Sequence, residues 1–207
     1  MPEWIFLIII LIFSAVIHEV SHGTAANYLG DSTAKYAGRL TLNPIKHLDP
    51  FGSFLLPLLM LLATGGRGPV FGWAKPVPIN PYNFRDQKYG SAKVAAAGPA
   101  ANFAVALFFG LALRFFPAIS AVSGLHLMFS YVVYINLLLG IFNLLPVPPL
   151  DGSHILFTFL PQGMENLKII LRQFGLFILL FIIFFLFNWV VLLINWIFSL
   201  IVGASLF

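Results

Sequence analysis

The feature that most constrains the fold is an apolar run from Trp4 to about Leu29 that contains three ionisable side chains. The run is long enough to cross a bilayer as a helix, which takes about 20 mostly apolar residues. Within it, His18, Glu19 and His22 stand at neighbouring positions. Ionisable side chains at membrane depth are costly, and by default they mark functional sites. The sequence therefore predicts a membrane-spanning helix that carries a polar site.

The spacing of these three residues indicates a metal site. Positions i and i+4 share one face of a helix, so His18 and His22 offer two imidazole nitrogens to one ion. Glu19 lies about 100° further round the helix, where it reaches a water at the metal without being a ligand. This pattern is typical of zinc metalloproteases, with the glutamate as general base. The alternative is a hydrogen-bonded core histidine, but an unpaired charge in a lipid-length helix is costly.

The composition extends this prediction to the whole chain. Of its 207 residues 60% are hydrophobic and 9% are charged, whereas globular proteins carry about 25% charged residues. We therefore expect an all-α polytopic membrane protein, a bundle of about four to six transmembrane helices with a re-entrant or membrane-dipping loop. It would form one domain over residues 1–207, with core motifs in 4–160 and C-terminal apolar helices in 174–206. The cations are scattered, which argues against nucleic-acid binding.

Two stretches predict elements at membrane depth that do not span it. Residues 51–63 are apolar but few for a span, and suit a re-entrant or interfacial segment. Residues 70–81 are apolar yet rich in Gly and Pro, and non-helical backbone at this depth is tolerated only against protein or a water-filled cavity. We interpret 70–81 as a loop that dips toward the site and offers backbone groups to an extended substrate. An interfacial aromatic loop is the alternative.

A catalytic zinc site usually has three protein ligands and a water, so a third ligand is expected. The chain has no cysteine, which leaves histidine and carboxylates. Asp151 alone among the acids stands at the tip of a span in a stiff, Pro-rich frame, and we predict it as the third ligand. A helix N-cap is the alternative role for Asp151, and His154 is the alternative ligand. His47 and Asp49 also have metal-binding side chains, but their surroundings favour an ordered surface loop.

Asn102 is a polar residue at the end of a run of small residues, Ala95 to Ala101. Small residues let helices approach closely in a membrane. The amide of Asn102 needs hydrogen-bond partners when buried. It either contacts a substrate carbonyl or a developing oxyanion, or it links two helices, and the sequence leaves both roles open.

The order of these motifs resembles that of the site-2 protease family, which are intramembrane zinc metalloproteases. The resemblance rests on residues 18–22, 71–76, 98–102 and 143–152, and it is to small bacterial members without an inserted PDZ domain. It implies that His18, His22 and Asp151 bind one Zn²⁺ per chain and that Glu19 is the catalytic glutamate. The residues expected beside the substrate or an oxyanion are Asn102, Asn143, Gly72 and Lys75.

The predicted function is an intramembrane zinc endopeptidase that hydrolyses peptide bonds within or near transmembrane segments of membrane proteins. Its partners would be a transmembrane substrate and the lipid bilayer, with homo-oligomerisation left open. Two alternatives are a divalent-metal transporter that uses the same ligands and a non-catalytic membrane scaffold. An enzyme that cleaves soluble or prenylated peptides is a nearer alternative.

The distribution of cations predicts the orientation in the cell membrane. If residues 51–63 do not cross, ten of the eleven Lys and Arg residues share one face, and Arg114 alone lies opposite. By the positive-inside rule the shared face is cytoplasmic and the N-terminus is outside. The active site would then lie nearer the cytoplasmic face.

Overall fold

A computed structural model describes residues 3–64, 75–116, 119 and 122–204. In this part of the chain the structure is helical, and four helical stretches are long and apolar enough to cross a membrane: Ile5–Tyr28, Gly90–Phe115, Gly124–Asn143 and Glu165–Val202. The helices that supply them are α1 (Glu3–Tyr28), α4 (Gly90–Phe115), α6 (Ser123–Asn143), and α8 (Glu165–Phe181) with η5 (Ile182–Leu186) and α9 (Phe187–Val202). The predicted all-α polytopic membrane fold is confirmed.

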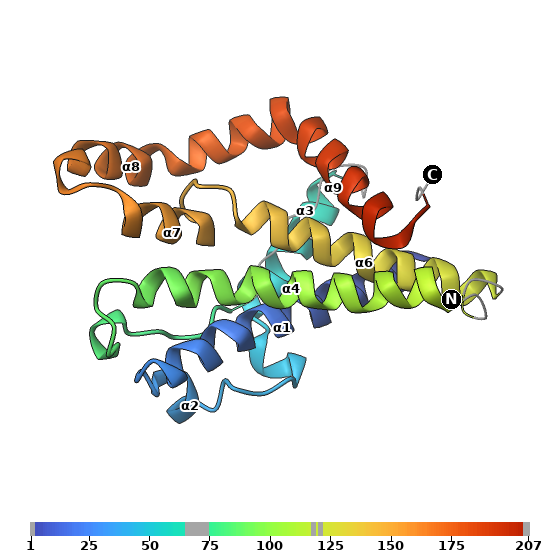
Figure 1. Ribbon diagram of the computed structural model, residues 1–207, viewed down its shortest axis with the longest axis horizontal. Coiled ribbons are helices and arrows are strands. Elements are labelled where there is room, and N and C mark those ends of the chain that lie inside the picture. The colour runs from blue at the N-terminus through green and yellow to red at the C-terminus, as the bar shows by residue number, and fades with distance from the viewer. Residues whose placement is uncertain (1–2, 65–74, 117–118, 120–121, 205–207) are drawn as a thin grey trace.

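Helices α1, α4 and α6 run lengthwise side by side, and α8 and α9 form one bent helix above them (Figure 1). Both described chain ends lie at one end of the bundle, which we call the terminal end. The opposite end holds the last turn of α1, the start of α4, helix α7 (Asp151–Phe159), η4 (Gln162–Met164) and the start of α8. Because Lys93, at the start of α4, and Lys168 and Arg172, in the first half of α8, belong to segments at this opposite end, we call it the cationic end.

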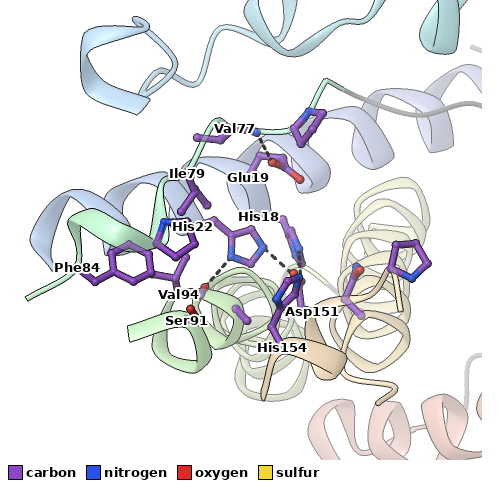
Figure 2. Close-up of a pocket in the computed structure, with 15 residues that line it drawn as sticks. His18, Glu19, His22, Val77, Ile79, Phe84, Ser91, Val94, Asp151 and His154 are labelled. Atoms are coloured by element: carbon purple, nitrogen blue, oxygen red, sulfur yellow. Dashed lines mark hydrogen bonds and ion pairs between the residues drawn. The ribbon is translucent and has the colours of Figure 1, made fainter. Parts of the chain in front are cut away.

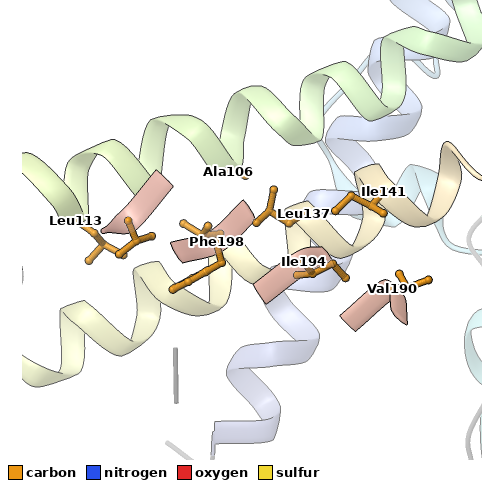
Figure 3. Packing of buried hydrophobic residues seen from close by; sticks show 9 residues of the cluster. Ala106, Leu113, Leu137, Ile141, Val190, Ile194 and Phe198 are labelled. Atoms are coloured by element: carbon orange, nitrogen blue, oxygen red, sulfur yellow. The ribbon is translucent and has the colours of Figure 1, made fainter. Parts of the chain in front are cut away.

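An apolar cluster holds α4, α6 and α9 together toward the terminal end (Figure 3). Its centre is fully buried, with Ala106, Val133 and Leu137 at 0% exposure and Phe198 at 1%. In a bilayer such contacts stabilise by close packing, since lipid tails are as apolar as the side chains. The large apolar side chains on the outside, such as Phe108, are exposed as a lipid-facing surface requires.

The short elements between α1 and α4 lie beside the bundle: α2 (Thr33–Tyr36), η1 (Pro44–His47), the π-helix η2 (Pro50–Leu55), α3 (Leu56–Thr64) and η3 (Pro81–Asn83). The stretch predicted as re-entrant, 51–63, is helical in η2 and α3. The 9 residues of α3 extend only about 14 Å, well short of a hydrocarbon core of about 30 Å. Residues 65–74, including the first part of the predicted dipping loop and Gly72, lie outside the described part of the chain.

Residues 75–85, which we call the strap, lie across α1 and are anchored at two points. Arg39 Nη2 donates to the carbonyl oxygen of Lys75 at 2.6 Å. The backbone N–H of Asn80 donates to Asp31 Oδ2 at 2.7 Å. Asp31 is fully buried, and a buried carboxylate needs such donors. The strap is thereby held against the helix that carries His18, Glu19 and His22.

Candidate metal centre

Three donor groups from two distant segments converge near the middle of the bundle (Figure 2). Asp151 Oδ2 lies 3.0 Å from His18 Nε2 and 3.3 Å from His22 Nε2. One ligand atom from each of these residues lies within 4.8 Å of the others. Both histidines are buried, at 7% and 6% exposure. The geometry brings together the three residues that the sequence predicts as ligands.

The local sequence explains how the donors meet. His18 and His22 share a face of α1 because they are four residues apart. Asp151 is the first residue of α7, and the N-cap is Leu150. The alternative that Asp151 caps the helix is therefore wrong, and its carboxylate turns toward the imidazoles. Gly152 permits the close turn, because a Cβ there would lie 2.2 Å from the carbonyl oxygen of Leu144.

Each imidazole has an acceptor at its Nδ1 edge. His18 Nδ1 lies 2.5 Å from Asn102 Oδ1, and His22 Nδ1 lies 2.7 Å from the carbonyl oxygen of Val94. A neutral imidazole has one N–H and one lone pair. With the N–H at Nδ1, both Nε2 lone pairs point at the Asp151 carboxylate. Three lone-pair donors at this distance repel each other unless a cation lies among them, so the donor set fits a metal ion.

The charge state of Asp151 agrees with this. Burial raises the pKa of the Asp151 carboxyl, but in the metal-free site hydrogen bonds and charges from protonated His18 and His22 outweigh burial and lower it to about 2, and a bound cation would act in the same direction. The carboxylate is thus anionic at neutral pH. Two imidazoles and one carboxylate are a donor set that zinc accepts in catalytic sites.

Gly98 of α4 keeps open the space in front of the Nε2 atoms of His18 and His22. A Cβ on Gly98 would lie 2.4 Å from His22 Nε2 and 2.6 Å from His18 Nε2. No real Cβ approaches a heavy atom so closely, so any larger residue would displace the imidazoles. The small residues of this stretch were predicted to serve helix packing, and Gly98 in addition shapes the site.

Glu19 does not join the three donors. Its Oε2 accepts a hydrogen bond of 2.9 Å from the backbone N–H of Val77 in the strap (Figure 2). Both residues border a cavity of about 370 Å³ that His18, His22 and Asp151 also line. This is within the volume range of pockets that bind a small ligand.

The remaining sequence candidates lie at varied distances from the cavity. Asn143 lines it, and its Nδ2 donates to the carbonyl oxygen of Leu139 at 3.0 Å. Asn102 is fully buried behind His18, and its amide contacts His18, Ser14 and Asn136. Lys75 is exposed at the start of the strap, where the next two residues, not Lys75, line the cavity.

The alternative ligands stay apart from the donor set. His154 lines the cavity but is exposed and does not belong to the described group of three. His47 Nε2 bonds the carbonyl oxygen of Thr41 at 2.8 Å, and Asp49 accepts from the N–H of Gly52 at 2.6 Å. His47 and Asp49 thus form the ordered loop that the sequence favours.

A multi-pass helical protein with this buried donor set defines a membrane metalloenzyme, and comparison with known proteins gives the family. The family model described as Peptidase family M50 matches residues 118–182, a segment that includes Asp151. The chain is 41% identical over 185 residues to "Putative zinc metalloprotease YwhC" of Bacillus subtilis, covering 86% of this chain and 80% of that protein. No solved structure matches the present chain.

More distant relatives agree. The chain is 32% identical to "Putative zinc metalloprotease Rip2" of Mycolicibacterium smegmatis, covering 84% of this chain and 65% of the relative. It is 31% identical to "Putative zinc metalloprotease MJ0611" of Methanocaldococcus jannaschii, covering 75% of this chain and 73% of that protein. The chain therefore belongs to peptidase family M50, the site-2 proteases, and it is a zinc metalloprotease. The predicted family, enzyme class and zinc cofactor are confirmed.

Sequence reasoning missed four groups at this site: the Val94 carbonyl, the Val77 N–H, Ser14 and Asn136. The first two are backbone groups, which carry no signal in a sequence. Asn136 had one, since an amide inside an apolar span must find a partner. Ser14 precedes His18 by four residues and so shares its face of α1.

Proposed function

We propose that this zinc metalloprotease is an intramembrane endopeptidase that cleaves peptide bonds within or near transmembrane segments of membrane proteins. The convergence of His18, His22 and Asp151 carries the proposal, because the two histidines belong to a helix long and apolar enough to cross a membrane. His18 is ten residues before Tyr28, the end of α1, which corresponds to about 15 Å along the helix. A substrate must therefore reach a site well inside the bundle.

In this proposal the residues that would hold zinc are His18 and His22, through their Nε2 atoms, and Asp151, through a carboxylate oxygen. The Nδ1 bonds to Asn102 and Val94 hold both rings in place, as outer partners of metal-bound histidines do. Bound zinc supplies Lewis-acid polarisation of the scissile carbonyl and makes water a nucleophile near neutral pH.

Glu19 is the general base and acid. Its carboxylate takes the proton of the attacking water and returns it to the leaving amine. The N–H of Val77 bonds Oε2, which restrains the carboxylate at the cavity wall with Oε1 as its second acceptor oxygen. A base held in one orientation loses less entropy on reaching the transition state.

The substrate is a locally unwound segment. A helical peptide bond is shielded by its own hydrogen bonds, and its backbone groups need partners once unwound in the membrane. The cavity beside the strap offers both space and polar groups. Asn143 is one of these groups, and we propose that it contacts the substrate.

The cationic end faces the cytoplasm by the positive-inside rule, with both described chain ends outside. The chain contains no cysteine, which makes a labelling test direct. Single-cysteine variants Tyr36→Cys and Phe116→Cys, both at exposed positions, are treated in intact cells with a membrane-impermeant maleimide. We expect labelling of the second variant only, and labelling of the first only would reverse the orientation.

The function is tested with purified protein and single-span membrane peptides in detergent, with products identified by mass spectrometry. We expect the wild type to contain zinc and to cleave inside the span. Asp151→Ala should lose both zinc and cleavage, whereas Glu19→Gln should lose cleavage alone. Zinc transport into sealed vesicles without cleavage would favour the transporter, and unchanged behaviour of a His18→Ala variant would favour the scaffold.

A further inference from the structure

Behind His18, at the ring edge away from Asp151, three buried polar side chains form a continuous hydrogen-bonded chain. Asn102 and Asn136 are at 0% exposure and Ser14 is at 3%. They belong to α4, α6 and α1, so the chain joins three membrane-spanning helices. A buried polar network is costly unless each member is paired, and here the members pair with one another.

The polarity of this network is set by a backbone carbonyl. Asn136 Nδ2 lies 2.9 Å from the carbonyl oxygen of Val132 and 2.9 Å from Ser14 Oγ. A carbonyl oxygen only accepts, so the NH₂ end of Asn136 must face Val132. The oxygen end of Asn136 must then face Asn102.

The direction of the hydrogen bonds extends from Asn136 through Asn102 to His18. Asn102 Nδ2 lies 2.8 Å from Asn136 Oδ1 and 3.3 Å from the carbonyl oxygen of Ser14. Both partners accept, so Asn102 turns its NH₂ toward them and its Oδ1 toward His18. His18 must then have its proton on Nδ1, which leaves the lone pair on Nε2 for the metal.

His22 is held in the same tautomer by a single hydrogen bond. Its Nδ1 donates directly to the carbonyl oxygen of Val94. His18 has no backbone carbonyl at its Nδ1 edge. Its partner is the amide of Asn102, which is oriented by Asn136 Oδ1 at 2.8 Å and, through a longer bond of 3.3 Å, by the Ser14 carbonyl. An amide side chain can rotate by 180°, so its orientation needs a partner that a backbone carbonyl does not need.

We propose that Asn136 is a positioning residue of the zinc site: through Asn102 it fixes the tautomer of His18 and so raises zinc affinity. This rests on the proposed role of His18 as a ligand. Asn136 contacts neither the ligand atoms nor the cavity. Its effect is therefore exerted through the orientation of one amide.

The direct test is Asn136→Leu, which keeps the approximate shape and removes the closer of the two acceptors of Asn102, leaving only the longer bond to the Ser14 carbonyl. Asn102 can then turn its NH₂ toward His18, which shifts the proton of His18 to Nε2 and removes the lone pair. We expect the zinc dissociation constant to rise about 10-fold, at the lower end of what loss of an outer partner costs. The dissociation constant is measured by competition with a chromophoric chelator in detergent.

Two serines give a matched pair of gentler variants, which also serve if Asn136→Leu does not fold. Ser14 and Ser130 are both buried, at 3% and 1% exposure. Ser14 Oγ accepts from Asn136, whereas Ser130 Oγ has no hydrogen-bond partner among the described residues. Ser14→Ala should weaken zinc binding about threefold, a smaller loss than that of an outer partner, and Ser130→Ala should leave it unchanged.

A second readout separates positioning from general stabilisation. Zinc raises the melting temperature of a protein that binds it only when folded, by an amount set by its affinity. If the network only holds the helices together, the zinc-free melting temperature of Asn136→Leu and Ser14→Ala falls while the zinc-induced increment is unchanged. That result would overturn the inference, whereas a reduced increment supports it.

His18→Ala distinguishes failure of this inference from failure of the proposed site. If His18→Ala binds zinc as the wild type does, His18 is not a ligand and both proposals fall. If His18→Ala loses zinc but Asn136→Leu and Ser14→Ala bind it with unchanged affinity, the ligand set stands and the relay through Asn136 is wrong.

Discussion

Helix α4 meets its neighbours in two different ways along its length. At the level of Gly98 and Asn102 it faces the imidazoles of α1, and the contacts are directional hydrogen bonds. About one turn after Asn102, from Ala106 to Leu113, it enters the apolar cluster, where the contacts are packing alone. The same helix thus combines a region specified by polarity with a region specified by shape.

This difference predicts that the two regions tolerate different kinds of substitution. A hydrogen-bonded site depends on which atom is a donor and which an acceptor, so a substitution that keeps shape but changes polarity is severe. A packed apolar region tolerates swaps that keep volume and responds to changes of size.

The largest contrast is between two substitutions that keep shape. Glu19→Gln should lower the cleavage rate about 10²–10⁴-fold, since it removes a general base, with zinc content unchanged. Leu137→Met in the apolar cluster should cost less than about 1.5 kcal/mol of unfolding free energy and leave cleavage intact. Rates on a membrane peptide and metal content measure both. Full activity in Glu19→Gln would remove Glu19 from the chemistry.

Two glycines of α4 sharpen the contrast. A Cβ on Gly98 would meet His22 Nε2 at 2.4 Å, and a Cβ on Gly110 would meet Ile201 Cγ2 at 2.4 Å. Gly98→Ala should weaken zinc binding by about 100-fold, because displaced ligands lose their geometry. Gly110→Ala should change the melting temperature, since Ile201 must shift, and leave zinc affinity unchanged. Equal zinc affinity in both variants would contradict the geometry of the site.

A loss of volume tests the apolar region itself. Phe198→Ala should lower the unfolding free energy by about 3 kcal/mol, since it leaves a cavity among fully buried neighbours. Zinc affinity of the folded fraction should stay as in the wild type, because the cluster lies away from the donors. Unfolding in mixed detergent measures the first quantity and chelator competition the second. A parallel loss of zinc affinity would show that the two regions are coupled.

The contact between the strap and Glu19 has a smaller expected effect. Val77 stands between Pro76 and Pro78, and its N–H donates to Glu19. Val77→Pro removes this donor, and we expect the cleavage rate to fall about 10-fold through the less restrained base. Val77→Ala keeps the N–H and is the control for the lost side chain. Equal rates in the two variants would show that the N–H does not position Glu19.

The sequence predicted the parts of this site that follow from local geometry. His18 and His22 follow from the helical repeat, and Asp151 from a rigid turn after a span. The partners of these residues depend on which helices meet and at what height, which no single stretch determines. Asn102 illustrates the limit: both roles were open in the sequence, and its contacts with His18 and Asn136 indicate a link between helices at the metal site.

Replacing Asp31, which anchors the strap, gives the smallest predicted loss of stability, and this loss depends on pH. Burial raises the pKa of Asp31, but hydrogen bonds from Thr33, Asn83 and Asn80 outweigh burial and lower it below its usual value. A lowered pKa in the folded state gives stability that is present above the unfolded pKa of about 3.9 and is lost as the pH falls through the folded pKa. Asp31→Asn should therefore lower the unfolding free energy by about 1 kcal/mol at pH 7.

This loss should shrink as the pH falls below about 4, where the Asp31 carboxylate of the unfolded chain takes up a proton first and the folded one follows at its lower pKa. Unfolding of both proteins in detergent between neutral and acidic pH measures it. Glu165→Gln is the control, because Glu165 is exposed and pairs with Lys168 within α8, away from the strap. If Asp31→Asn is equally destabilised at every pH, the loss comes from packing and not from the charge of Asp31. The strap would then be held by the shape of its anchor, as the apolar cluster is, and not by polarity.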